Sequence, residues 1–176
     1  RLGPSVNVPV RDLAGEHAKG NGIKAQGSDG ISFVNLRVEW TGGPKSTNGA
    51  YGVYPVSSKH VLIDKVFVKG ASDAGIYVGQ SEQIIVRNSR ARCADAAAGI
   101  WPFACDDTIV QFNEVTGTKG TKDGMGYDAD YQCKRTIIQN NYSYENEGGF
   151  ILICSPGNSY NLDNIVRNTV HIHDGI

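Results

Sequence analysis

The chain has 176 residues, of which 17 are Lys or Arg and 18 are Asp or Glu, so its formal net charge at pH 7 is −1. This length suits a single domain with a sizeable core. No apolar run approaches the roughly 18 residues of a membrane-spanning helix, and no block of basic residues offers a surface to nucleic acid or an anionic membrane. We therefore expect no nucleic-acid partner and no membrane span.

The composition favours short strands over helices. The chain has 22 Gly, 15 Ile and 16 Val but only 6 Leu. β-Branched residues are typical of strands, and the Gly, Asn and Asp residues between them are typical of tight turns. A helical bundle is excluded, and we expect many short strands joined by turns.

A phrase of Gly followed by apolar residues recurs six times along the chain, at 22–25, 52–55, 75–78, 99–102, 126–129 and 149–152. Its apolar anchors are Ile23, Val53, Ile76, Ile100, Tyr127 and Phe150. A second apolar phrase follows each one, at 31–35, 61–65, 84–88, 109–113, 137–141 and 165–169. Both phrases repeat every 23–30 residues. Such a shared period indicates a solenoid.

The period and the content of each unit predict an all-β fold, a right-handed parallel β-helix of about six coils. Helical repeats would need a 3.6-residue periodicity, and leucine-rich repeats would need more Leu than this chain has. We expect one domain over residues 1–176. Because no amphipathic helix precedes Gly22 to cap the first coil, we expect this domain to be a segment of a longer solenoid.

Equivalent residues of successive coils should lie above one another, about 4.8 Å apart. In the second phrase this places an Asn at the same turn of four coils, at Asn35, Asn88, Asn113 and Asn141. Stacked side-chain amides can hydrogen-bond to one another. We therefore predict an Asn ladder, which Lys65 and Thr169 interrupt.

The four cysteines are Cys93, Cys105, Cys133 and Cys154, and no two of them form a Cys-x-x-Cys pair for zinc or redox chemistry. We expect buried thiols or, at most, one or two disulfide bridges. The residues alone leave this choice open.

Strand alternation predicts which side chains of the first phrase face outward. If each anchor points inward, the next residue points outward, which gives the column Lys24, Tyr54, Tyr77, Trp101, Asp128 and Ile151. Two positions further on lies a second outward column, Gln26, Val56, Gly79, Phe103, Asp130 and Ile153. Aromatic rings on an open face can pack against the C–H surface of a sugar, although stacked aromatics can equally serve only to stabilise the ladder. We predict a solvent-accessible, substrate-binding strip made of Tyr54, Tyr77, Trp101, Phe103, Lys24 and Lys122.

Two acidic residues stand at the end of this strip. Asp128 and Asp130 are two positions apart on one strand, so both carboxyl groups leave the same face, with Cα atoms about 6.6 Å apart. That spacing is close to the carboxyl separation at which inverting glycosidases hold a water. Two neighbouring negative charges also raise one pKa, as a general acid requires. The pair is our candidate for the catalytic acid and base of a hydrolase.

The same carboxylates allow two other interpretations. Asp123, Asp128 and Asp130 could together hold Ca²⁺, which takes about six to eight oxygen ligands. They could also form a solvated acidic turn without a chemical role. Hydrolysis by the pair would require no cofactor, so Ca²⁺ belongs only to the cation-site interpretation.

Several segments resemble the pectate-lyase-like family of right-handed parallel β-helix proteins. Within residues 30–92, the runs Arg-Val-Glu-Trp-Thr-Gly-Gly-Pro-Lys from Arg37 and Ala-Ser-Asp-Ala-Gly-Ile-Tyr-Val-Gly-Gln from Ala71 are similar to bacterial β-helix repeat proteins. From Ala98 onward, Gly-Ile-Trp-Pro-Phe, Asp-Gly-Met-Gly-Tyr-Asp and Asn-Glu-Gly-Gly-Phe resemble secreted β-helix proteins of polysaccharide-degrading bacteria. The resemblance implies a lyase, hydrolase or epimerase that acts on a polysaccharide in a groove along the helix. This chain has a counterpart of only one polygalacturonase motif, the pair Asp106-Asp107.

These observations predict a carbohydrate-active β-helix protein that is secreted, periplasmic or at the cell surface. It would bind or cleave an extracellular polysaccharide in a groove along the parallel sheet, and hydrolysis is favoured over a lyase or epimerase reaction. The alternative is a non-catalytic structural or adhesive solenoid that binds through its surface. Its open ends could then associate end to end or laterally with other copies.

Overall fold

The computed structural model describes residues 2–43, 49–120 and 122–175. In this part of the chain every regular element is a β-strand, which confirms the all-β prediction. None of the described segments is a helix of the length and apolar character needed to cross a membrane. The strands are β1 (Val6–Glu16), β2 (Ile23–Gln26), β3 (Asp29–Glu39), β4 (Val53–Val56), β5 (Lys59–Asp64), β6 (Phe67–Lys69), β7 (Ile76–Gly79), β8 (Glu82–Arg87), β9 (Arg90–Arg92), β10 (Ala98–Phe103), β11 (Asp106–Gln111), β12 (Glu114–Thr116), β13 (Met125–Asp130), β14 (Ile137–Gln139), β15 (Tyr142–Tyr144), β16 (Gly149–Cys154), β17 (Ile165–Arg167) and β18 (Val170–Ile172).

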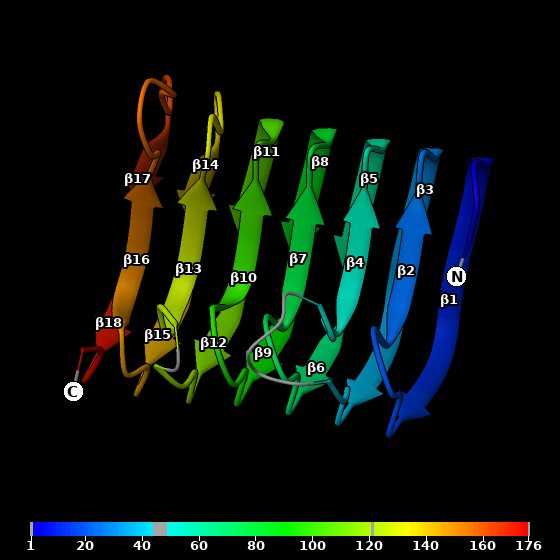
Figure 1. Ribbon diagram of the computed structural model, residues 1–176, viewed down its shortest axis with the longest axis horizontal. Coiled ribbons are helices and arrows are strands. Elements are labelled where there is room, and N and C mark those ends of the chain that lie inside the picture. Colours follow the sequence, from blue (N-terminus) through cyan, green and yellow to red (C-terminus); the bar gives the residue numbers. More distant parts are fainter. Residues whose placement is uncertain (1, 44–48, 121, 176) are drawn as a thin grey trace.

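The strands wind into coils that stack side by side along the long axis of the molecule (Figure 1). β1 forms the first coil, β2 and β3 form the second, and each of the five later coils contains three strands. Each strand pairs in parallel with the equivalent strand of the neighbouring coil. The predicted parallel β-helix is confirmed, with about seven turns instead of six. The additional turn is β1, which lacks the Gly-apolar phrase.

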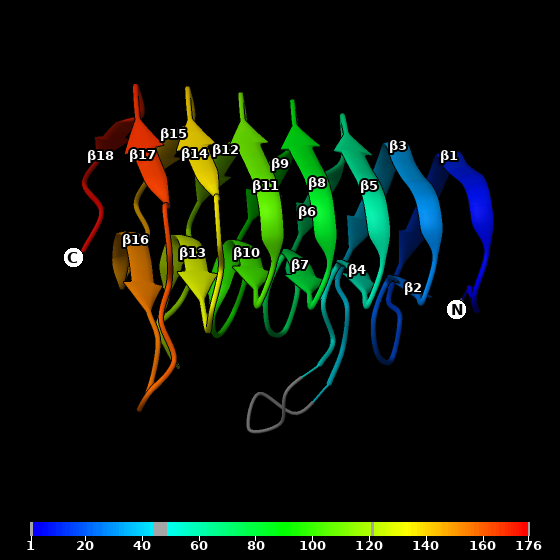
Figure 2. The same cartoon turned by 90° about the horizontal axis from the view of Figure 1, so that it is seen from above.

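The coils form three faces, which can be followed from above in Figure 2. Face A is the six-stranded sheet in the order β16-β13-β10-β7-β4-β2. Face B holds β5, β8, β11, β14 and β17, and face C holds β6, β9, β12, β15 and β18. β3 pairs with both β5 and β6, so in the second coil one long strand runs along faces B and C.

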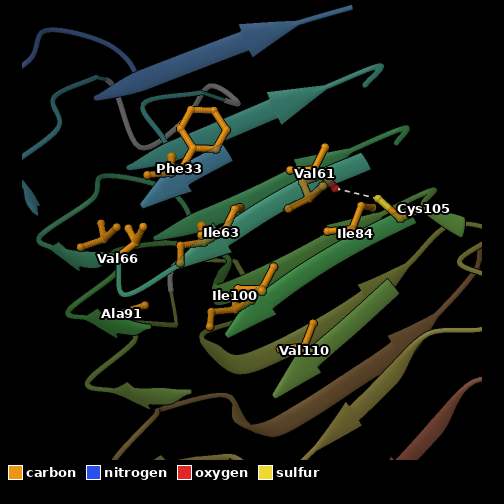
Figure 3. Packing of buried hydrophobic residues seen from close by; sticks show 14 of the residues in the cluster. Phe33, Val61, Ile63, Val66, Ile84, Ala91, Ile100, Cys105 and Val110 are labelled. Carbon is orange, nitrogen blue, oxygen red and sulfur yellow. Dashed lines mark hydrogen bonds between the residues drawn. The ribbon is translucent and has the colours of Figure 1, made fainter. Parts of the chain in front are cut away.

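Apolar side chains from the three faces fill the interior. On face A the register stacks five of the predicted anchors in one column, Ile23, Val53, Ile76, Ile100 and Tyr127. The last four of them are fully buried. Figure 3 shows Ile100 in the same cluster as Ile63 and Ile84 of face B. The inward orientation of this column is therefore confirmed.

The prediction that Phe150 is the sixth anchor is wrong by one residue. Tyr127 pairs with Ile151 instead. The Phe150 ring packs edge-on against Tyr127, with centroids 5.9 Å apart, and stacks on His171 at 5.2 Å. Phe150 and Ile151 are both apolar and both pack against the core, so the sequence pattern alone could not show that Ile151 is the residue in register with Tyr127.

Polar side chains form a ladder at the corner between faces B and C. The backbone N–H of Ser89 donates to Asn113 Oδ1 at 2.9 Å, and the N–H of Asn113 donates to Asn141 Oδ1, also at 2.9 Å. The N–H of Asn141 then donates to Thr169 Oγ1 at 3.4 Å. The ladder is confirmed for the two asparagines, and Thr169 continues it, contrary to the prediction.

The other two predicted members, Asn35 and Asn88, lie outside the ladder. Thr108 of β11 pairs with Ile84 of β8, so the second phrase is offset by one residue between these two coils and Asn88 is out of register with Asn113. Asn35, Lys65 and Asn88 have left-handed backbone with φ of 53°, 55° and 50°. Asn adopts this conformation more readily than most residues, which explains its recurrence there without an amide ladder.

All four cysteines are free thiols, so the disulfide alternative is wrong. Cys105 and Cys133 are buried, and the Cys105 thiol donates to the Val78 carbonyl oxygen at 3.1 Å (Figure 3). Burial raises the pKa of Cys105 to about 12 and that of Cys133 to about 11. Both groups are therefore unreactive packing residues at neutral pH.

Glycines line the corner at which the chain enters face A. A Cβ atom at Gly52 would overlap Val68 Cγ1 and the carbonyl oxygen of Gly75. A Cβ at Gly99 would likewise overlap Val115 Cγ1. The recurring Gly of the first phrase is therefore explained by the close approach of face C and the adjacent coil.

We expect Gly52→Ala to reduce the free energy of unfolding by about 1–3 kcal/mol, because the added methyl group overpacks this corner. Gly15→Ala in β1 is the control, since a Cβ there meets no atom within 4 Å. Its effect should stay within about 0.5 kcal/mol. Urea denaturation followed by circular dichroism would measure both values, and equal losses would contradict the close-packing explanation.

Candidate functional site

The predicted aromatic strip lies on the outer side of face A. Tyr54, Tyr77 and Trp101 come from β4, β7 and β10, and Tyr77 pairs directly with Trp101. The ring centroids of Tyr54 and Tyr77 are 4.9 Å apart, and those of Tyr77 and Trp101 are 4.8 Å apart. Phe103 continues the cluster, with its ring 5.8 Å from Trp101. The strip is thus continuous, as predicted.

The strip is only partly open to solvent, so the prediction of a solvent-accessible strip holds only in part. Tyr77 is only 8% exposed, and Tyr54, Trp101 and Phe103 are half-buried. Tyr51, which precedes β4, stacks on Tyr77 with ring centroids 4.4 Å and planes 22° apart. Tyr51 stands before the Gly-apolar phrase, which is why the repeat gave no indication of this cover.

The two lysines predicted to bind substrate have partners within the protein. Lys24 Nζ lies 4.6 Å from the ring centroid of Tyr54, a cation–π contact. Lys122 Nζ lies 3.1 Å from Asp73 Oδ2. Asp73 is buried, and its Oδ2 also accepts a hydrogen bond from the backbone N–H of Gly49 at 3.1 Å. Lys122 therefore ties the segment before β13 to the segment before β7.

The acidic pair lies on β13, beside the aromatic strip. Phe103 pairs with Asp130, and the core residues Tyr127 and Ala129 alternate with the two acids, so both carboxyl groups leave the outer side of face A. Asp128 is 0% exposed and Asp130 is 3% exposed. The predicted face is confirmed, but the predicted contact with solvent is wrong. Every residue of β13 is buried.

On the next strand, β16, the neighbours of this pair differ from the prediction. Asp128 pairs with Leu152 and Asp130 pairs with Cys154, in place of Ile151 and Ile153. The cause is the one-residue shift described above for this coil. The Cys154 thiol donates a hydrogen bond of 2.8 Å to Asp130 Oδ1.

The Cys154 thiol orients the Asp130 carboxyl and does not serve as a nucleophile. Burial, followed by the hydrogen bond to Asp130, raises the pKa of Cys154 to about 12. The sulfur consequently stays protonated at neutral pH and remains a hydrogen-bond donor.

Asp128 is a neutral acid at physiological pH. Burial, followed by the negative charges of Asp130 and Asp123, raises the pKa of Asp128 to about 10. The protonated Asp128 carboxyl can hydrogen-bond to the neighbouring carboxyl of Asp130. Within the described residues its oxygens have no other hydrogen-bond partner, and the buried indole Nε1 of Trp101 has none. The site therefore holds unsatisfied polar atoms next to an aromatic cluster, an arrangement more typical of function than of packing.

Asp123 is the acid that solvent reaches. It lies in the turn before β13 and is exposed, unlike the two acids on the strand. Burial of part of its carboxyl, followed by the charge of Asp130, raises the pKa of Asp123. From the sequence, Asp123 was expected only as a cation ligand. The adjacent Gly124, with a φ of 66° and no room for a Cβ against Gly120, was the signal that this turn folds back tightly.

The arrangement groups the exposed Asp123 with the two buried acids of β13, Asp130 and the protonated Asp128. Among the residues that the structure describes, no three His, Cys, Asp or Glu side chains are grouped so that they could hold a metal ion. This geometry gives no support to a Ca²⁺ site of Asp123, Asp128 and Asp130. The carboxyl groups are instead coupled by their charges, which suits proton transfer.

The chain belongs to the family described as the right-handed beta helix region, whose profile matches residues 21–175. This confirms the right-handed parallel β-helix and the family-level resemblance. Over 82 residues, or 44% of the chain, it is 38% identical to a lacto-N-biosidase of Bifidobacterium longum subsp. longum. It spans only 5% of the length of that relative.

Solved structures share the fold. A proposed glycosyl hydrolase from Parabacteroides merdae matches with a TM-score of 0.57 and 13% identity, over 90% of this chain and 82% of that one. A GH136 lacto-N-biosidase from Eubacterium ramulus matches with a TM-score of 0.54 and 20% identity, over 92% of this chain and 37% of that one. At these identities the likeness concerns the fold alone.

The raised pKa of Asp128 predicts a pH-dependent stability. The carboxyl is protonated in the folded protein up to about pH 10, whereas it ionises near pH 4 in the unfolded chain. The folded state holds the extra proton between these values, so stability falls as pH rises, by at most about 1.4 kcal/mol per pH unit. Asp128→Asn keeps the shape without the titration, so its stability should exceed that of the wild type increasingly above about pH 4.

Chemical denaturation at several pH values between about 4.5 and 8 would measure this effect. Asp163→Asn, at an exposed position before β17, is the matched control and should follow the wild type. Parallel pH profiles for the wild type and Asp128→Asn would show that Asp128 is ionised in the folded protein.

Proposed function

We propose that this chain forms part of a carbohydrate-active β-helix protein, a glycoside hydrolase whose acidic residues act on the outer side of face A. The observation that carries the proposal is the grouping of an exposed acid, Asp123, with the buried acids of β13 beside the aromatic strip, where Phe103 pairs with Asp130. Glycoside hydrolases require such a pair, one carboxyl that gives a proton and one that stays ionised. The relatives named as lacto-N-biosidases and a glycosyl hydrolase support the same class.

In the proposed reaction Asp123 is the general acid. Its raised pKa keeps a larger protonated fraction near neutral pH, and its proton moves to the glycosidic oxygen as the bond from that oxygen to the anomeric carbon breaks. Asp130 either attacks the anomeric carbon as this bond breaks, forming a glycosyl-enzyme ester that a water deprotonated by Asp123 then hydrolyses, or removes a proton from a water that attacks the anomeric carbon directly. Both acids of β13 are buried, but Asp130 keeps 3% of its surface exposed and Asp128 keeps none, so we assign to Asp128 the tuning of Asp130 in place of the catalytic role expected from the sequence.

The substrate class follows from the relatives and from the strip. We propose an oligosaccharide or extracellular polysaccharide, with a lacto-N-biosyl terminus as the first structure to test because two relatives are lacto-N-biosidases. Phe103 pairs with Asp130, and its ring lies 5.8 Å from that of Trp101, so these two half-buried rings would form the floor under the sugar. From such substrates we also propose that the protein acts outside the cytoplasm, as a secreted, periplasmic or cell-surface protein.

We expect Asp123→Asn and Asp130→Asn each to lower turnover by about 100-fold or more, because each removes a proton-transfer group. Release of p-nitrophenol from p-nitrophenyl lacto-N-bioside, and reducing-sugar release from a polysaccharide panel, would measure it. Asp163→Asn should leave turnover unchanged. Wild-type-like turnover by either variant would overturn the assigned roles, and unsaturated uronate products would show a lyase.

A non-catalytic solenoid is the second candidate, and the burial of Asp128 together with the self-packed aromatic strip favours it. Such a protein would bind a glycan or another copy of itself through its surface or its open ends. Glycan binding without turnover on the whole panel would support it. Sedimentation equilibrium over a range of concentrations would test the self-association.

A further inference from the structure

A groove of about 690 Å³ follows the corner between faces B and C. None of its lining residues belongs to face A, so it is separate from the acidic site. We call it the corner groove, and its principal lining residues are Asn88, Arg90, Phe112, Glu114, Asn140 and Tyr142. Its walls carry aromatic rings, amides and a guanidinium group, which differ from the apolar strip of face A.

Phe112 occupies an unfavourable position in this groove. Its backbone is left-handed, with a φ of 57°, which bulky residues seldom adopt. The neighbouring coils place Asn88 and Asn140 at the same corner with the same backbone, and Asn tolerates it well. The Phe112 side chain is also 56% exposed. Local stability favours Asn at this position, so the aromatic ring requires another explanation.

Packing does not provide that explanation. Two other aromatic residues with left-handed backbone have partners, because Trp40 receives a cation–π contact from Lys69 at 5.3 Å and Tyr131 stacks on Phe103 at 4.7 Å. Within the described part of the chain, the Phe112 ring has no ring or cation contact. It is an exposed aromatic platform that the fold does not use.

A second ring and fixed polar groups complete the groove. Tyr142, from β15, is 39% exposed. Arg90 is exposed, and its Nε lies 3.1 Å from Glu114 Oε2. Glu114 also accepts hydrogen bonds from Arg92 at 2.7 Å and from the Tyr144 hydroxyl at 3.1 Å. The guanidinium of Arg90 is thereby held in place with donors left for a ligand.

The corner groove lacks a catalytic acid. Burial alone would raise the pKa of Glu114, but the hydrogen bonds from Arg92 and Tyr144 hold it below its usual value. Glu114 therefore stays ionised and serves to position Arg90. Exposed aromatic faces with amide and guanidinium groups between them suit a ligand that has C–H faces and many hydroxyl groups.

We propose that the corner groove is a second glycan-binding site, which takes a sugar ring against Phe112 and Tyr142 and hydrogen-bonds its hydroxyl groups through Arg90, Asn88 and Asn140. It rests on the proposed function only in the class of ligand. Binding here, away from the acids of face A, would hold a long glycan on the protein without cleaving it.

Affinity electrophoresis in gels that contain polygalacturonate, xylan or gastric mucin would test this, with Asp130→Asn as the parent protein so that no glycan is cleaved. Adding Phe112→Asn should weaken binding by about 3- to 10-fold, as expected for the loss of one stacking ring. The melting temperature should stay constant or rise by about 2 °C, because Asn suits the left-handed backbone. Tyr160→Ser, at an exposed tyrosine outside the groove, should bind like the parent.

Each outcome decides the inference. It is overturned if Phe112→Asn binds like the parent, or if none of the three glycans retards the parent. The proposed function is judged separately, from turnover of p-nitrophenyl lacto-N-bioside. A protein that binds through the groove but never cleaves would overturn the hydrolase and leave the groove standing.

Discussion

Parallel stacking of the coils is the constraint on which the rest of the structure depends. Each strand hydrogen-bonds to its equivalent in the next coil, about 4.8 Å away, so a residue meets its counterparts above and below before it meets anything else. Ile76 thus lies between Val53 and Ile100, and Asn113 bonds directly to Asn141. Side chains of similar character are therefore stacked in columns along the solenoid, and an unfavourable residue in a column affects the residues above and below it.

The candidate site lies where one such column of side chains changes from aromatic to acidic. On the outer side of face A the column is aromatic at Tyr77 and Trp101 and becomes acidic at Asp128, one coil further on. The acid is consequently covered by apolar surroundings, and desolvation keeps it neutral. Burying a carboxyl without partners lowers stability, and such sites recur where function outweighs stability. The exposed Asp123 connects this buried charge system to solvent.

The repeat pattern was sufficient to predict the fold, because strand alternation and coil stacking are properties of the period. It could not predict register to the residue, since neighbouring apolar residues such as Phe150 and Ile151 satisfy the same pattern. The repeat pattern could not predict the solvent exposure of the aromatic strip either, for a different reason. Tyr51 covers Tyr77 from outside the phrases, and its position depends on tertiary contacts that no period encodes.

The two surfaces proposed for glycans violate local rules in complementary ways. Asp128 is a polar group placed where desolvation disfavours it, and Phe112 is an apolar group placed where both the backbone and the exposure disfavour it. A solenoid tolerates both because its stability is spread over many similar coil-to-coil interfaces, so one unfavourable residue weakens only its own neighbourhood. Comparison with the equivalent residues of adjacent coils makes such unfavourable residues easy to recognise. At the corner of Phe112, the asparagines of the adjacent coils show which residue suits the left-handed backbone, so the exposed ring there stands out as a departure from the fold's own preference.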